Sequence, residues 1–138
     1  MPRKRLRLRD FDYTTPGAYF VTICTASRAP LLVVPVAREI QRQLTKLVER
    51  FPGLVVDESV IMADHLHVIF VLDGHTAPLP RILQALKSLT TLMVPRERWP
   101  LWQRGYYEHV IRNEDELEMI REYIHNNPLA EQVRIQEG

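Results

Sequence analysis

Hydrophobic residues along the chain follow two different spacings, and the changes between them predict seven elements. Stretches rich in β-branched and aromatic residues read as strands, at residues 17–26, 54–62, 65–72 and 105–112. Stretches with apolar residues three and four positions apart read as helices, at residues 34–53, 81–94 and 113–126. The predicted order is therefore β-α-β-β-α-β-α.

Local signals mark where these elements begin and end. Pro35 suits the first turn of a helix, and Pro52 and Gly53 end the same helix. Asn113 opens the last helix, with Glu116 three residues later in a capping-box arrangement. Only Ala63 and Asp64 separate the second and third strands, which predicts an antiparallel hairpin.

This order predicts a ferredoxin-like (RRM-like) α+β fold, in which helices cover one face of an antiparallel sheet, with one further helix at the C-terminus. The other sheet face is free to carry a site. In this arrangement the strand at residues 65–72 lies well inside the sheet. At 138 residues, we expect a single domain over residues 1–138, preceded within that range by a basic arm at residues 1–15.

Composition is ordinary for a soluble globular protein, with 46% hydrophobic and 25% charged residues. The single cysteine, Cys24, cannot form an internal disulfide, and no apolar run is long enough for a membrane span. The basic N-terminus is followed by "DFDYTTPG", where a signal peptide would have an apolar core. We therefore expect a cytoplasmic protein with no membrane partner. The net charge of +1 hides a basic arm, which suits a polyanion such as nucleic acid but is also typical of a solvated terminus; its basic residues are Arg3, Lys4, Arg5, Arg7 and Arg9.

The stretch "ADHLHVIF" carries the first candidate chemistry, because His65 and His67 are two residues apart on a predicted strand. Side chains alternate along a strand, so both imidazoles leave it on one face, with α-carbons about 6.6 Å apart. Two such rings can converge on one metal ion. They can equally be two ordinary histidines at the edge of a core, and their spacing alone favours that interpretation.

The last predicted helix supplies further candidates. Its buried stripe is Leu117, Ile120 and Ile124, and Tyr123 and Asn127 lie together on one edge of that stripe, one turn apart. A helix laid beside the sheet can therefore present a phenol and an amide oxygen to the face that carries the histidines.

These motifs are similar to those of a known family. "DHLHVIF" resembles the histidine–hydrophobic–histidine motif of the HUH endonucleases, and "REYIHNNPL" resembles the nucleophile helix of their single-tyrosine transposases. Together with "PGAYFVTICTASR", "LKS" and "LWQRGYYEHVIRNE", they match the IS200-like transposases of insertion sequences, and among them the REP-associated tyrosine transposases. The resemblance covers residues 16 to about 130 in the expected order.

The resemblance implies a role for each matching residue. Tyr123 matches the nucleophile, whereas His65, His67 and Asn127 match the ligands of a Mg²⁺ or Mn²⁺ ion. The implied activity is DNA transposition by metal-dependent nicking and joining of single-stranded DNA at hairpins, through a 5′-phosphotyrosine intermediate. Implied partners are hairpin-bearing single-stranded DNA in the bacterial nucleoid and, as in some relatives, a second copy of the chain. From their charge alone, Lys87 and Arg104 join Arg3, Lys4, Arg5 and Arg7 as candidate DNA contacts. Solvated surface charge is the more common role of such residues.

Two other functions fit parts of the sequence. The first is a catalytically silent, domesticated protein that binds hairpins, which the fold and the basic arm allow. The second is a metal-dependent phosphohydrolase, because "HLHVIF" resembles a histidine-triad motif, although Ile69 occupies the place of its third histidine. Tyr106 and Tyr107 are rival nucleophiles to Tyr123, and the role of His109 is left open.

Overall fold

The computed structural model describes residues 17–126. Its strands are β1 (Gly17–Cys24), β2 (Leu54–Ile61), β3 (His65–Leu72) and β4 (Tyr107–Ile111). Its α-helices are α1 (Val36–Arg50), α2 (Leu79–Thr91) and α3 (Glu114–Asn126). Short 3₁₀ turns follow β1 and α2, at Ala26–Arg28 and Arg96–Arg98. Every predicted strand and helix is present in the predicted order.

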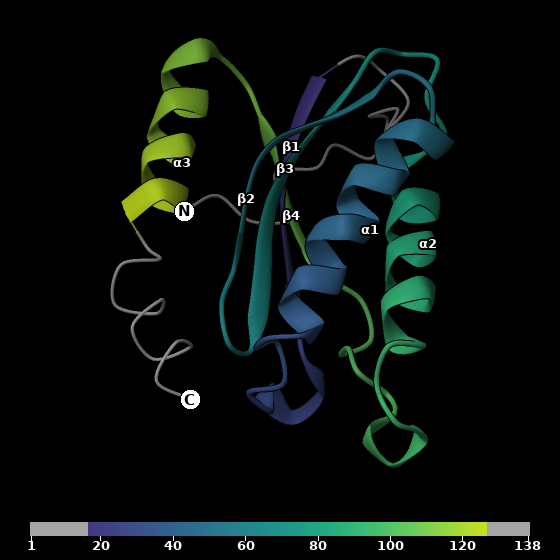
Figure 1. Cartoon of the computed structure of the whole chain (residues 1–138). Helices are drawn as coiled ribbons and strands as arrows, with labels where there is room; N and C mark the ends of the chain where they lie inside the picture. Colours follow the sequence, from purple (N-terminus) through teal and green to yellow (C-terminus); the bar gives the residue numbers. More distant parts are fainter. Residues whose placement is uncertain (1–16, 127–138) are drawn as a thin grey trace.

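The strands form one antiparallel sheet in the order β2-β3-β1-β4, which confirms the ferredoxin-like prediction. The histidine-bearing strand β3 lies between β2 and β1, inside the sheet as expected. Helices α1 and α2 cover one face, and α3 lies against the other (Figure 1). The second face of the sheet therefore carries both α3 and the candidate site.

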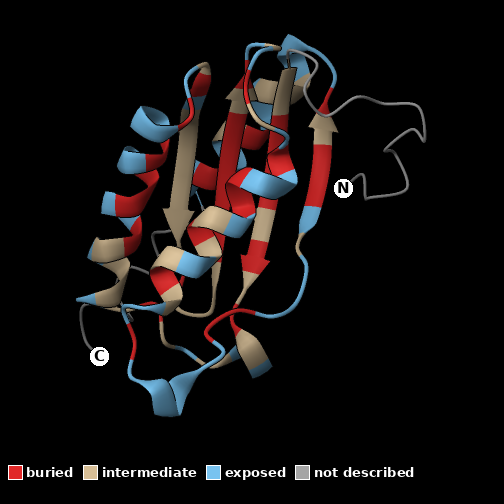
Figure 2. Ribbon diagram, turned by 90° about the vertical axis from the view of Figure 1, so that its right-hand side faces the viewer, coloured by how far each residue is buried: buried red, intermediate tan, exposed pale blue. Residues whose placement is uncertain are grey.

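Alternation along the strands divides the core into two parts. The larger part packs β-strand residues such as Tyr19, Val21 and Phe70 against α1 and α2. The smaller part, under α3, consists of Phe20, Ile69, Ile111, Ile120 and Ile124. Buried residues accordingly line the strands and the inner sides of the helices (Figure 2).

Small differences from the predicted boundaries have local causes. Helix α2 begins two residues earlier than predicted, because Pro80 is accommodated in its first turn. Helix α3 begins after Asn113, whose side-chain oxygen accepts a hydrogen bond from the backbone N–H of Glu116 at 2.9 Å, as the capping box predicts. Strand β2 has an irregularity that the sequence did not indicate: a β-bulge between Val56 and Glu58 leaves Asp57 without a partner residue on β3.

Candidate active site

The two histidines of β3 lie on the sheet face that α3 partly covers. Their ring centroids are 4.7 Å apart and the ring planes are inclined at 73°. His67 is buried, with 7% of its surface exposed, and His65 is partly exposed at the start of the strand. The strand therefore brings the two rings together, as the two-residue spacing predicts.

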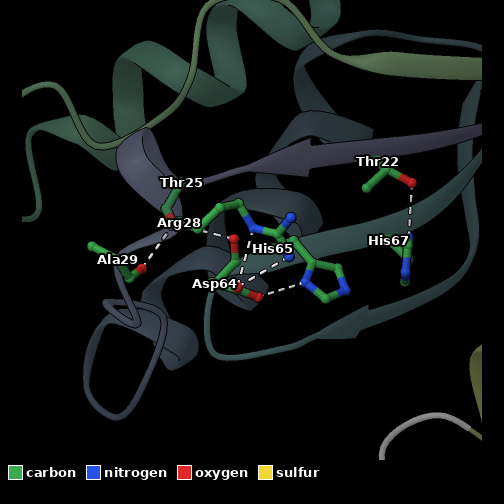
Figure 3. A network of polar contacts seen from close by, with 7 residues as sticks. All are labelled: Thr22, Thr25, Arg28, Ala29, Asp64, His65 and His67. Carbon is green, nitrogen blue, oxygen red and sulfur yellow. Dashed lines mark hydrogen bonds and ion pairs between the residues drawn. The ribbon is translucent and has the colours of Figure 1, made fainter.

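Each imidazole is oriented through its Nδ1 atom (Figure 3). Thr22 lies opposite His67 in the register of β1 and β3, and its Oγ1 is 2.9 Å from His67 Nδ1. Asp64 Oδ1 is 2.7 Å from His65 Nδ1. With Nδ1 protonated, each ring donates this hydrogen bond and keeps the lone pair of Nε2, the arrangement that histidine ligands of metals commonly show.

Burial at the site favours the neutral form of His67. Burial, and to a smaller extent the neighbouring His65, lower the pKa of His67 to about 4. At neutral pH its ring is therefore uncharged, which is the state that can donate an electron pair.

Asp64 is held beside His65 as an ionised carboxylate. Burial alone would raise its pKa, but hydrogen bonds from His65 and Arg28 and their charges lower the pKa below its ordinary value. Arg28 donates from Nε to Asp64 Oδ2 at 3.1 Å, and its second nitrogen lies 3.0 Å from the same oxygen. Asp64 contacts Nδ1 of His65 and leaves Nε2 free. It therefore orients the ring and does not point toward the space between the two histidines.

Helix α3 brings Tyr123 to this pair. The phenol ring lies at 62° to the ring of His67, with centroids 5.5 Å apart, and edge-on to Phe20 at 6.2 Å. The buried residues Ile120 and Ile124 dock the helix on the sheet, as the predicted stripe requires. Tyr123 nevertheless remains 46% exposed.

Polar contacts fix α3 at two places. Arg121 donates from Nε and Nη2 to the two carboxylate oxygens of Asp57, at 2.8 and 2.6 Å. At the start of the helix, Glu116 lies 2.6 Å from Nε2 of the buried His109 and accepts a hydrogen bond from the backbone N–H of Arg112 at 2.7 Å. These contacts attach the helix to β2 and to β4.

A family model described as "Transposase IS200 like" matches residues 15–127. The chain belongs to the IS200-like transposase family. An uncharacterised protein of Haemophilus influenzae is 30% identical to it, with 92% of this chain and 88% of the relative covered. A second protein of that organism, provisionally named a REP-associated tyrosine transposase, is 26% identical over 86% of this chain and 73% of its own length.

Two solved structures share the fold of this IS200-like transposase. One is a REP-associated tyrosine transposase bound to a REP hairpin, with a TM-score of 0.74, 21% identity, and coverage of 91% of this chain and 74% of the other. The other is a protein of Deinococcus radiodurans provisionally named a transposase, with a TM-score of 0.60, 22% identity, and coverage of 87% and 95%.

Several predicted residues of the transposase lie outside residues 17–126 and have no structural description. They are Asn127 of the expected metal set and Arg3, Lys4, Arg5 and Arg7 of the basic arm. Within the described residues, no group of three or more His, Cys, Asp or Glu side chains could hold a metal ion. A metal ion on the histidine pair would therefore require a ligand of another kind or from another part of the chain, and Asn127 stays the predicted one.

The two other candidate DNA contacts belong to α2 and to the loop before β4. Lys87 is on α2, in the helix layer, and its Nζ donates to the backbone carbonyls of Gln103 and Gly105 at 2.8 and 2.6 Å. Burial lowers its pKa. Arg104 is exposed in the loop that Lys87 holds. Contact of either residue with DNA stays a prediction, whereas the role of Lys87 in holding this loop was not foreseen.

The remaining aromatic and histidine candidates have clear positions. Tyr106 packs against the larger core, and Tyr107 is exposed, as expected of neighbours on a strand. His109, whose role the sequence left open, is buried beside Glu116 and links β4 to α3. Trp102 is buried and donates from Nε1 to Thr90 Oγ1 at 2.8 Å.

None of the described helices combines the length and hydropathy required to cross a membrane.

Proposed function

We propose that this transposase nicks and rejoins single-stranded DNA beside hairpins, with Tyr123 as nucleophile and a Mg²⁺ or Mn²⁺ ion held by His65, His67 and Asn127. The observation that carries the proposal is the phenol ring of Tyr123, half-exposed and 5.5 Å from the ring of His67. Family membership supports transposition, and the REP hairpin bound to a structurally similar transposase supports the choice of substrate.

The donor set fits the proposed ion. Two imidazole nitrogens and an amide oxygen are compatible with Mn²⁺ or Mg²⁺, and hydrogen bonds to Nδ1 leave Nε2 of each ring as the donor. When bound, the ion would polarise the scissile phosphate and stabilise charge on its oxygens.

The chain's own residues would perform the transfer. Tyr123 loses its phenol proton as its oxygen bonds to phosphorus, and the bond from phosphorus to the 3′ oxygen breaks. The products are a 5′-phosphotyrosine link and a 3′-oxygen that takes up a proton. Because the link keeps the energy of the phosphodiester, attack by another 3′-hydroxyl rejoins DNA without a nucleotide cofactor.

The direct test is incubation with a hairpin-bearing single strand labelled at its 3′ end, in Mn²⁺ or Mg²⁺ and in EDTA. We expect a labelled protein–DNA adduct on denaturing gels that requires the metal and is lost when the hairpin is removed. Salt-sensitive hairpin binding without an adduct in any divalent metal would contradict the proposal and support the silent binding protein instead.

A further inference from the structure

Tyr107 occupies the same sheet face as the histidines, although it lies two strands away from them. In the sheet register Thr22 of β1 pairs with His67 on one side and with Tyr107 on the other. Residues directly opposite one another in a sheet project to the same face. His67, Thr22 and Tyr107 therefore form one row across β3, β1 and the edge strand β4.

The side chain of Tyr107 is unusually exposed for its position. It is 61% exposed, whereas Glu108 and His109, which follow it on β4, are 3% and 2% exposed. The large aromatic side chains exposed within residues 17–126 are Trp99, Tyr107 and Tyr123. Tyr123 on α3 contacts His67, and Tyr107 lies in the same sheet row as His67, two strands away. The ring of Tyr107 is too exposed for packing to account for its presence there.

The spacing suits a strand of nucleic acid laid across the sheet. Two strand separations place Tyr107 about 10 Å from His67. Successive nucleotides of one DNA strand rise about 3.4 Å in a duplex and more when the strand is extended, so one to three nucleotides span this distance. A phosphate beside the histidines would thus bring a nearby unpaired base over the phenol ring.

We propose that Tyr107 is a stacking platform for an unpaired base within about three nucleotides of the phosphate bound at His65 and His67. The inference rests on the proposed function, because it takes single-stranded DNA as the ligand. The flat ring offers a surface to any base, so Tyr107 contributes affinity and positioning, with little discrimination among bases. This stacking role needs the ring of Tyr107 and not its hydroxyl group, whereas a nucleophile would need the hydroxyl group.

The test is a cycle between a protein variant and an abasic substrate. Affinity is measured for hairpin-bearing strands that carry one abasic nucleotide at each of three positions on either side of the cleavage site. All proteins carry Tyr123→Phe, so that cleavage does not interfere. We expect Tyr107→Ala to weaken binding of the intact strand by roughly 5- to 150-fold and Tyr107→Phe to keep wild-type affinity. At one abasic position, Tyr107→Ala should cause no further loss.

A matched control is Leu92→Ala, which removes a side chain with 63% exposure at the end of α2, in the layer behind the sheet. It should leave affinity unchanged. Unchanged affinity of Tyr107→Ala, or losses that multiply at every abasic position, would overturn the inference. Adduct formation by the wild-type protein is scored separately, so failure of the proposed function is distinguished from failure of the stacking role.

Discussion

The ring of Tyr123 lies against the ring of His67, although one belongs to the last helix and the other to an inner strand. Ile120 and Ile124 hold the helix on Phe20 and Ile69 of the sheet, and this packing sets the approach of the phenol. The proposed chemistry depends on this approach and on the orientation of the two imidazoles, and each can be tested separately.

Thr22→Val tests the orientation of His67. The substitution keeps the branched shape of the side chain but removes the oxygen 2.9 Å from His67 Nδ1. Loss of such an outer partner typically lowers metal affinity roughly 10- to 100-fold, so we expect a corresponding rise in the Mn²⁺ concentration needed for adduct formation. Thr45→Val, which removes an exposed hydroxyl group from α1, is the control. Equal Mn²⁺ dependence in Thr22→Val and wild type would show that Thr22 does not act on a bound ion.

Asp57→Asn and Arg121→Gln test the attachment of the nucleophile helix to β2. Each disrupts the bidentate pair of hydrogen bonds between these side chains. We expect each to slow adduct formation in a single turnover more than it weakens hairpin binding. The double variant should be no slower than either single variant, because both remove the same contact. Glu118→Gln removes the other, more exposed partner of Arg121 and should have little effect. Independent, multiplying effects of the Asp57 and Arg121 substitutions would contradict this coupling.

Glu116 should make the free energy of unfolding decrease in acid. Burial alone would raise its pKa, but hydrogen bonds from the Arg112 backbone and His109 lower the pKa below its ordinary value of 4.5. A carboxyl whose pKa is lower in the folded state stabilises the fold above the unfolded pKa, and this contribution disappears as pH falls through the folded pKa. The difference in free energy of unfolding between wild type and Glu116→Gln should therefore be constant near neutral pH and shrink below about pH 4.5. Chemical denaturation at several pH values measures it, with the exposed Glu122→Gln as reference; a difference that does not vary with pH would refute the assignment.

Lys87→Met tests the loop before β4. Two carbonyl partners are lost, so we expect the free energy of unfolding to fall by about 1 kcal/mol, allowing for partial exposure of the bonds. The exposed neighbour in the loop, Arg104→Met, should leave stability unchanged. The same variants show whether either cation also contacts DNA. Each lost phosphate contact lowers the slope of the logarithm of the hairpin-binding constant against the logarithm of salt concentration by about one. Unaltered stability of Lys87→Met would mean that these hydrogen bonds contribute nothing net.

Periodicity and turn signals were enough to predict the fold, because both faces of the sheet are apolar where helices cover them. The shared face of His65 and His67 follows from strand alternation, and the approach of Tyr123 follows from the stripe of Ile120 and Ile124. Strand alternation is local geometry, whereas the stripe shows only which side of the helix is buried, and the resemblance to the family indicated that this side meets the histidine face.

Other parts of the site depend on relationships that a single sequence does not contain. Thr22 reaches His67 only because β1 and β3 pair in one register. Asp57 is available to Arg121 at a bulge inside a stretch that reads as a regular strand. Lys87 looked like a solvent-exposed cation because its partners are backbone carbonyls in a distant loop. In each case the decisive contact joins segments far apart in the chain.

The most direct measurement of the central claim is covalent adduct formation by three proteins on the same hairpin-bearing single strand in Mn²⁺. We expect wild type and Tyr107→Phe to form the adduct and Tyr123→Phe to form none, with hairpin binding retained by all three. Peptide mapping of the wild-type adduct should place the DNA on Tyr123. As much adduct from Tyr123→Phe as from wild type would contradict the assignment of the nucleophile and, with it, the proposed mechanism.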